Sequence, residues 1–122
     1  NEISYKIRGA IFEVYNNLGP GLLESIYEEA LCYELTKAGL RVAVQVPLEV
    51  LYDGIPLKQK FRMDMVVEDL VVIEIKSVEE ICDLHHKQLL TYLKLSNKKL
   101  GILVNFNSPD ISKAIFRKVN GL

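Results

Sequence analysis

The sequence is poor in the features that mark secreted, zinc-binding and membrane proteins. It has only two cysteines, Cys32 and Cys82, which are too few and too far apart for a disulfide framework or a four-cysteine zinc site. No uncharged apolar run approaches the roughly 20 residues of a membrane helix, and no basic stretch with an apolar signal core follows the N-terminus. We therefore expect reduced cysteines, a cytoplasmic location and no membrane partner.

Repeats, low-complexity segments and linkers are also missing from the 122 residues. A chain of this length fits one ordinary domain, and a second domain would have no room. Apolar residues make up 49% and charged residues 25% of the composition, which is the balance of a globular protein. We expect a single domain over residues 1–122. A homodimer is also considered, because so short a chain would gain contact length by pairing, although no interface motif is visible.

The net charge of −1 argues against a protein that coats nucleic acid by charge alone, but it hides a gradient. Residues 1 to 83 carry 8 basic and 15 acidic side chains, whereas residues 84 to 122 carry 7 basic side chains and only Asp110 as an acid. The C-terminal part could therefore hold a nucleic-acid backbone, through Lys94, Lys98, Lys99, Arg117 and Lys118. The alternative is that these residues, with Lys113, form an ordinary solvated face.

Apolar spacing predicts two helices at the N-terminus. Residues 3 to 18 repeat apolar side chains at helical intervals up to Gly19-Pro20-Gly21, which predicts a helix over about 2–17. A second helical pattern starts at Leu22 and stops at Gly39. We expect the two helices to form a hairpin-like pair.

From Arg41 the apolar period changes to two, which predicts strands. Val42, Val44 and Val46 alternate with polar or small residues, Pro47 interrupts, and residues 48 to 52 lead to the turn dipeptide Asp53-Gly54. A returning strand through Lys58 to about Val67 and a third strand over 70–77 complete a three-stranded antiparallel meander. A crossover helix over 84–95, with Asp83 as its N-cap, and a parallel fourth strand over 100–105 follow. Residues 111 to 122 form either a helical turn or an edge segment. The fold class is α/β, with a mixed sheet.

The segment V-V-I-E-I-K-S-V at 71 to 78 holds two charges inside an otherwise buried strand. An unpaired buried charge is costly, so Glu74 and Lys76 need partners or a function. They are two residues apart and share one face of the strand. Asp64 is a third charge in apolar surroundings, on the preceding strand. Two converging carboxylates suit Mg²⁺ or Mn²⁺, and a lysine beside them can activate water or stabilise a phosphate; the alternative is an internal ion pair.

The register of these two strands decides whether the acids can meet. A two-residue turn that pairs Val67 with Leu70 would place Asp64 and Glu74 on opposite faces. A three-residue loop or a bulge that pairs Val67 with Val71 places Asp64 opposite Glu74, and such features are common beside active sites. We predict the second register, with Glu24 and Gln88 facing the acids.

Polar residues on the crossover helix form a stripe that could face this site. His85, Gln88 and Tyr92 lie at i, i+3 and i+7, and the alternative is that they are the wet side of the helix. Glu24 lies in the first turn of the second helix, where it could also serve only the helix dipole.

Motifs along the whole chain resemble one family. G-L-L-E-S-I-Y at 21 to 27 is similar to the motif of the GxxExxY proteins, in Gly21, Glu24 and Tyr27. N-N-L-G-P-G-L-L-E-S, F-R-M-D-M-V-V, V-I-E-I-K-S-V, H-x-x-Q-L-L-T-Y-L-K-L and G-I-L-V-N-F-N extend the likeness. That family is assigned to the PD-(D/E)XK nuclease superfamily. The resemblance implies its restriction-endonuclease-like core of helix, three-stranded meander, helix and strand.

The resemblance also implies roles for single residues. Asp64, Glu74 and Glu24 would be catalytic acids that bind metal, with the Ile75 backbone carbonyl as a further ligand and Lys76 as the lysine of the motif. Gln88 and Tyr92 resemble the Gln-x-x-x-Tyr element of the RecB-like branch, which positions substrate or metal, and His85 and Tyr27 join that set. The chain departs from the family at Met63, in place of the superfamily's proline, and at Tyr15, where many relatives have histidine.

Two classes of function follow. The first is hydrolysis of phosphodiester bonds by a nuclease that depends on Mg²⁺ or Mn²⁺, with DNA favoured over RNA as the substrate. The second is a nucleic-acid-binding or regulatory module that keeps the nuclease fold without cleaving, because a fold does not fix a function. A third possibility is an interaction domain in which the polar residues only pair with one another.

Overall fold

The computed structural model of the protein describes residues 1–121. Its elements follow one another in the order helix, helix, strands, helix and strands. They are α1 (Glu2–Leu18), α2 (Glu24–Lys37), β1 (Val42–Leu48), β2 (Leu51–Tyr52), β3 (Ile55–Pro56), β4 (Phe61–Val67), β5 (Val71–Lys76), α3 (Asp83–Ser96), β6 (Leu100–Asn105), the 3₁₀ turn Ile111–Lys113 and β7 (Ile115–Val119).

The first helix forms where the apolar spacing predicts it. Ile7, Ala10, Ile11 and Val14 lie on one face of α1 and are buried. The Asn1 side chain accepts a hydrogen bond from the Ser4 amide at 2.9 Å, which caps the N-terminus of the helix. The following Gly19-Pro20-Gly21 ends the helix and turns the chain into α2.

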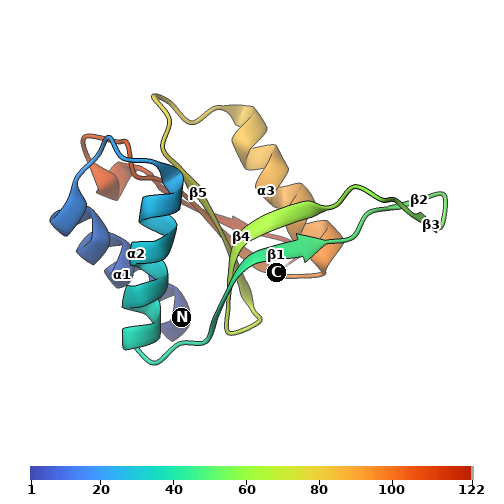
Figure 1. Cartoon of the computed structure of the whole chain (residues 1–122), viewed down its shortest axis with the longest axis horizontal. Coiled ribbons are helices and arrows are strands. Elements are labelled where there is room, and N and C mark those ends of the chain that lie inside the picture. Colours follow the sequence, from blue (N-terminus) through green and yellow to red (C-terminus); the bar gives the residue numbers. More distant parts are fainter. Residues whose placement is uncertain (122) are drawn as a thin grey trace.

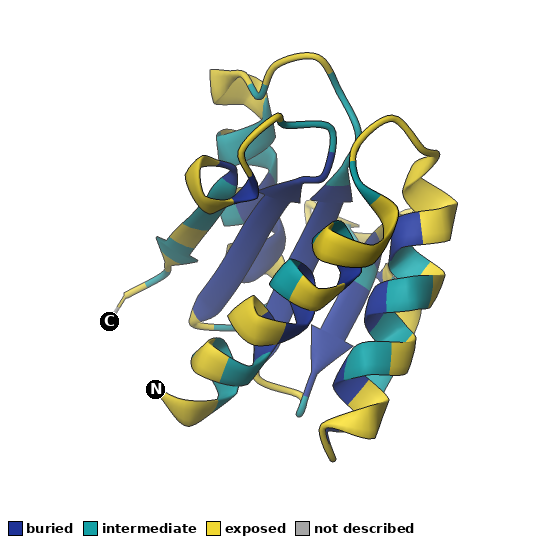
Figure 2. Ribbon diagram, turned by 90° about the vertical axis from the view of Figure 1, so that its left-hand side faces the viewer, coloured by how far each residue is buried: buried dark blue, intermediate teal, exposed yellow. Residues whose placement is uncertain are grey.

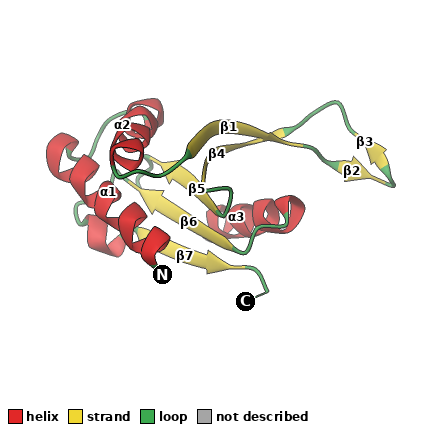
Figure 3. Ribbon diagram, turned by 90° about the horizontal axis from the view of Figure 1, so that it is seen from below, coloured by secondary structure: helices red, strands yellow, loops and turns green. Residues whose placement is uncertain are grey.

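One five-stranded sheet forms the centre of the molecule, in the order β1-β4-β5-β6-β7. Only β5 and β6 are parallel; the other neighbours are antiparallel. The strand-helix-strand connection through α3 produces the parallel pair. Figures 1 and 3 show α1 and α2 together on one side of the sheet and α3 on the other. This mixed sheet with three helices is the restriction-endonuclease-like architecture expected from the sequence.

Apolar side chains on the two faces of the sheet form two clusters. On the face of α1 and α2, the cluster includes Ile11, Leu31, Ile73 and Phe106. On the face of α3, it consists of Leu48, Met63, Val66, Val72, Leu89, Tyr92, Leu93 and Leu103. Figure 2 shows the central strands buried behind the helices, whose outer faces are exposed. The site described below lies on strands β4 and β5, which contribute residues to both clusters.

The connection between β4 and β5 has the predicted register. Val67 pairs with Val71 and Met65 with Ile73, so a three-residue loop joins the strands. Glu68 and Asp69 adopt left-handed backbone conformations, with φ of 53° and 57°. A tight connection between twisted strands needs this conformation. The predicted register, with Val67 opposite Val71, is confirmed, and the regular pairs extend to Met65 and Ile73, the residues next to Asp64 and Glu74.

The outer part of the meander differs from the prediction. Pro47 continues β1 instead of interrupting it, because β1 is an edge strand and a missing amide there leaves no ladder partner unpaired. The predicted strand from Lys58 begins only at Phe61, and residues 51–56 form a separate two-stranded hairpin. Its turn is Asp53-Gly54 as predicted, with φ of 55° and 76°.

Two smaller expectations also change. Helix α3 begins at Asp83, and its N-cap is Cys82 rather than Asp83. The tail contains both alternatives, since the 3₁₀ turn is followed by β7, an edge strand antiparallel to β6. Leu122 lies outside the described residues. Within residues 1–121, no helix has both the length and the apolar character needed to cross a membrane.

Candidate active site

Asp64 and Glu74 meet where strands β4 and β5 separate. Each acid accepts a backbone amide from the opposite strand: the Asp64 N–H donates to Glu74 Oε1 at 3.2 Å, and the Ile75 N–H donates to Asp64 Oδ2 at 2.8 Å. The last regular pair of the two strands on this side is Met65 with Ile73, and each of these residues is next to one of the acids. The two carboxylates therefore take the place of backbone partners at this fork in the sheet.

Strand β4 changes its alternation at the fork. Met63 and Val66 both belong to the cluster under α3, whereas Met65 and Val67 face α1 and α2. Strict alternation would put Met63 and Met65 on the same side. On β1, Gln45 lies between the paired residues Val44 and Val46 and has a φ of 50°, so both strands are distorted at this level.

Burial makes the Glu74 carboxyl unfavourable as an isolated anion. Its residue is only 5% exposed, and burial together with the negative charge of Asp64 raises the pKa of Glu74 to about 8. The Asp64 pKa is also raised, mainly by burial. The Ile75 amide and the positive charge of Lys76 partly oppose this rise. The pair therefore favours a proton or a cation between its oxygens.

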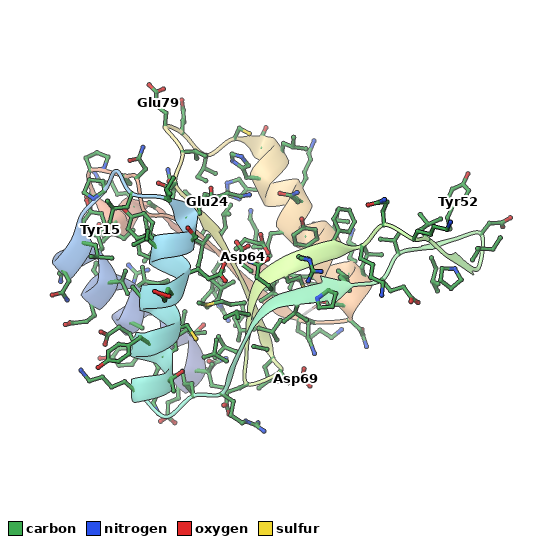
Figure 4. The ribbon with its side chains drawn as sticks, viewed as in Figure 1. Tyr15, Glu24, Tyr52, Asp64, Asp69 and Glu79 are labelled. Carbon is green, nitrogen blue, oxygen red and sulfur yellow. The ribbon has the colours of Figure 1, made fainter. Side chains whose placement is uncertain are left out.

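Glu24 reaches the site from the start of α2. Its Oε2 accepts a hydrogen bond from the Ser77 amide at 3.1 Å, and its negative charge contributes to the raised pKa of Asp64. The Ser77 hydroxyl donates to the Leu22 carbonyl at 2.6 Å. Figure 4 shows Glu24 at the end of α2 that lies toward Asp64. These contacts fix the chain directly after Lys76.

Tyr27 supports the same loop from inside the core. The side chain is fully buried and stacks on Phe106, with ring centroids 4.4 Å apart. Its hydroxyl donates to the Gly19 carbonyl at 2.6 Å and accepts from the Leu22 amide at 3.1 Å. The family resemblance predicts a substrate-positioning role for Tyr27. Because Tyr27 is completely buried, any influence on substrate would pass through this loop.

The polar residues predicted to form a stripe on α3, His85, Gln88 and Tyr92, have different surroundings. Burial, followed by the charges of Glu74 and Asp64, raises the Tyr92 pKa, and the ring packs against Phe61 of β4. Gln88 is half-buried one turn earlier on the same helix. The Nδ1 atom of His85 accepts a hydrogen bond from the Cys82 amide at 3.1 Å, which caps the helix. This ring nitrogen therefore serves the helix cap.

Two polar residues near the site are absent from the sequence prediction. Glu28 lies one turn after Glu24, its carboxylate accepts a hydrogen bond from Gln45 at 2.9 Å, and burial with the Asp64 charge raises its pKa. The buried Asn105, which pairs with Lys76 across β5 and β6, binds the Val78 amide and carbonyl at 3.1 and 2.9 Å. The i+4 spacing from Glu24 is the signal that could have indicated Glu28.

The predicted nucleic-acid contacts of the C-terminal part do not form one surface beside the acids. Lys98 makes a 2.8 Å ion pair with Asp69 in the loop before β5. Lys98 and Lys99 precede Leu100, which pairs with Val71 at the start of β5. Lys76 pairs with Asn105 at the other end of that strand. On β7, Arg117 lines a hollow with Arg8 of α1, whereas the Lys118 charge acts on His86 of α3. Lys94 is exposed in the last turn of α3.

Tyr15 belongs to the scaffold. Its hydroxyl donates to the Ser108 carbonyl at 2.6 Å and so ties α1 to the loop after β6. Figure 4 shows Tyr15 well to one side of Asp64. The hydrogen bond of Tyr15 is therefore made to this loop and not to the acids.

The donor set of Asp64 and Glu74 fits a hard divalent cation. Both acids offer oxygen ligands, and burial raises the pKa of each. Within residues 1–121, no three His, Cys, Asp or Glu side chains converge as a ready-made metal cage. Mg²⁺ does not require one, because it is usually bound through one or two carboxylates and completes its shell with water and substrate phosphate.

Comparisons with known proteins give the class of this fold and site. Residues 1–118 match the model of the PD-(D/E)XK nuclease superfamily, and the chain belongs to that superfamily. Nucleases of this superfamily generally use divalent metal ions. The chain is similar to the crystal structure of SSO0001, with 30% identity and a TM-score of 0.60 over 81% of this chain. It spans about half of that protein, 51% of its length. No curated protein matches.

Proposed function

We propose that the protein hydrolyses phosphodiester bonds in DNA with Mg²⁺ or Mn²⁺ at the Asp64–Glu74 fork. The observation that carries the proposal is the reciprocal insertion of the two carboxylates between β4 and β5, with Lys76 on the same strand as Glu74. Membership of the nuclease superfamily supports the reaction class. The finer family assignment, to GxxExxY proteins of the RecB-like branch, is part of the same proposal.

The chain's own residues supply most of the arrangement that hydrolysis needs. Asp64 and Glu74 would hold the metal ion, with Glu24 and the Ile75 carbonyl as further oxygen ligands. A bound divalent ion would polarise the phosphate and lower the pKa of a water molecule. Lys76 would stabilise the negative charge that develops on the phosphate oxygens. In the reaction, the water oxygen forms a bond to phosphorus, the bond to the leaving oxygen breaks, and that oxygen is protonated.

Residues around the acids would position the substrate. Tyr92 would face the pair from α3, where Gln88 precedes it by one turn, and both could donate hydrogen bonds to a phosphodiester or to metal-bound ligands. The Ser77, Glu24 and Leu22 contacts hold the chain after Lys76 in one conformation. Such preorganisation increases the rate because less rearrangement is needed in the transition state.

A panel of linear and circular DNA and RNA substrates tests the proposal. The wild type should cleave DNA with Mg²⁺ or Mn²⁺ and lose this activity in EDTA. Asp64→Ala should be inactive, and the matched control Glu79→Gln, an exposed acid on the loop after β5, should retain wild-type activity. Cleavage that persists in Asp64→Ala would remove the fork from the reaction.

One observation favours a second candidate, a module that binds nucleic acid without cleaving it. Glu24 is held by the Ser77 amide, and among residues 1–121 no three His, Cys, Asp or Glu side chains converge as a metal site. Wild-type protein that binds the panel but cleaves none of it with either metal would select this candidate.

A further inference from the structure

An arm, defined as residues 49–60, extends from the body of the protein. It contains the hairpin of β2 and β3, in which Leu51 pairs with Pro56 and Tyr52 with Ile55. Figures 1 and 3 show this hairpin projecting beyond the five-stranded sheet. Every residue from Leu51 to Arg62 is exposed. A two-stranded hairpin is only marginally stable in water, so an exposed arm of this kind is well suited to contact a partner.

The tip of the arm carries exposed apolar side chains, one of them aromatic, on both sides of its Asp53-Gly54 turn. Leu51 is 60% exposed, Tyr52 73% and Ile55 62%. Figure 4 shows Tyr52 near the far end of the arm and Asp64 in the body. Single exposed apolar residues are ordinary, but a contiguous group on a projecting element indicates an interaction site.

A basic segment, defined as Lys58, Lys60 and Arg62, connects this tip to the acid pair. All three side chains are exposed, and Arg62 is two residues before Asp64. Within residues 1–121, the ion pairs lie elsewhere, and none includes a member of this segment. The Arg62 Nη1 atom donates to the Gln45 carbonyl at 3.3 Å, which leaves its other donors available. The segment therefore carries positive charges that no carboxylate neutralises.

The root of the arm is anchored beside the fork. Phe61 packs against Tyr92, with ring centroids 5.1 Å apart, and Met63 lies in the cluster under α3. Met63 directly precedes Asp64 in β4. The basic segment is thus continuous with the site proposed for phosphodiester cleavage and is fixed relative to it.

We propose that residues 49–62 form a nucleic-acid-binding element. Lys58, Lys60 and Arg62 contact the phosphate backbone next to the bond at Asp64, and Tyr52 contacts bases farther along. This inference rests on the proposed function and names a substrate contact for it. Unpaired cations beside a phosphodiester site fit a polyanion, and aromatic or apolar side chains on such elements stack on bases or insert between them.

Binding measurements on the full chain test the proposal. Fluorescence anisotropy with labelled single-stranded and duplex DNA would be carried out in the Asp64→Ala background with Mg²⁺, so that the probe stays intact. The triple variant Lys58→Gln, Lys60→Gln, Arg62→Gln should bind at least about tenfold more weakly at 0.1 M salt. Its slope of log affinity against log salt should fall by about 2 to 3, since each phosphate contact contributes about 0.9.

A matched triple variant separates local contacts from total charge. Arg8→Gln, Lys37→Gln, Lys113→Gln removes the same charge from exposed positions on α1, α2 and the 3₁₀ turn. It should bind within about twofold of the parent. Tyr52→Ser should weaken binding several-fold without changing the salt slope, because it removes no phosphate contact. Circular dichroism should show all variants folded like the Asp64→Ala parent, because the added substitutions change only exposed side chains.

Three outcomes would overturn the inference. Equal losses in the two triple variants would show that only total charge matters. Unchanged binding in the basic-segment variant, with wild-type cleavage intact, would refute the arm but leave the nuclease proposal standing. Light scattering that finds a wild-type dimer and a Tyr52→Ser monomer would assign the arm to a second copy of the chain. Failure of the proposed function itself is distinct, since the wild type would then cleave none of the panel with either metal, whether or not the arm binds it.

Discussion

Replacing Glu74 with glutamine should stabilise the metal-free protein at pH 8. The pKa of the Glu74 carboxyl rises from 4.5 to about 8 in the folded state, because burial and the Asp64 charge disfavour its anion. Between these pH values the unfolded chain has released the proton while the folded chain retains it. The unfolded state therefore binds fewer protons, and stability falls as pH rises. Glutamine resembles the protonated acid at every pH, so Glu74→Gln should lose most of this dependence.

The size of the effect follows from the two pKa values. A difference of one in pKa corresponds to about 1.4 kcal/mol, so the change from 4.5 to about 8 corresponds to about 5 kcal/mol. Asp64 and Glu74 interact strongly, so this loss of stability belongs to the titration of the pair. Domains of this kind have unfolding free energies of roughly 5–15 kcal/mol, so the effect should be easily measured.

Urea unfolding in EDTA at intervals from pH 5 to pH 8.5 measures this dependence directly. The wild type and the exposed-acid control Glu79→Gln should lose stability together across this range, and Glu74→Gln should lose much less, because only the buried Asp64 then keeps a raised pKa. The slope of free energy against urea should be the same for all three, which shows that one transition is being compared. Equal pH dependence in wild type and Glu74→Gln would refute the reasoning about the buried pair.

Three further predictions concern metal binding, the role of Lys76 and the loop that Tyr27 supports. Saturating Mg²⁺ should raise the melting temperature of the wild type at pH 8 and not that of Asp64→Ala, because a ligand bound only by the folded state stabilises it; equal shifts in a thermal scan would contradict this. Lys76→Met should abolish DNA cleavage but keep or increase metal affinity in calorimetry, since a nearby positive charge opposes cation binding; unchanged turnover would remove Lys76 from the mechanism. Tyr27→Phe should cost about 1–3 kcal/mol in denaturant unfolding, because the Gly19 carbonyl and the Leu22 amide lose a buried partner; an unchanged midpoint would show that water replaces the hydroxyl.

The sequence is informative about the site where local rules determine geometry. The alternation of β5 places Glu74 and Lys76 on one face, and the number of residues between Val67 and Val71 sets the register that brings Asp64 close to Glu74. Both features depend on period and loop length, which can be counted. The strand and helix order similarly predicts the parallel pair of β5 and β6.

Other features depend on contacts between distant segments and cannot be counted in this way. The fork exists because Asp64 and Glu74 accept amides from each other's strands, which distorts the alternation of β4 at Met63. Glu28 approaches Asp64 only because α2 crosses the sheet at this point. The cap formed by His85 depends on the conformation of Cys82, which no spacing rule specifies. Residues 57–60 have β-like spacing but no partner strand, so the predicted strand starts late.

Calorimetric titration of Mn²⁺ into the metal-free wild type and its variants tests the central claim most directly. The claim is that Asp64 and Glu74 hold a divalent ion together. At pH 8 the wild type should bind the ion with release of protons, because the raised pKa of Glu74 leaves the pair partly protonated. Asp64→Asn and Glu74→Gln should each lose the binding, and Glu79→Gln should keep it. Absence of Mn²⁺ binding to the wild type, or equal binding in all four proteins, would contradict the account.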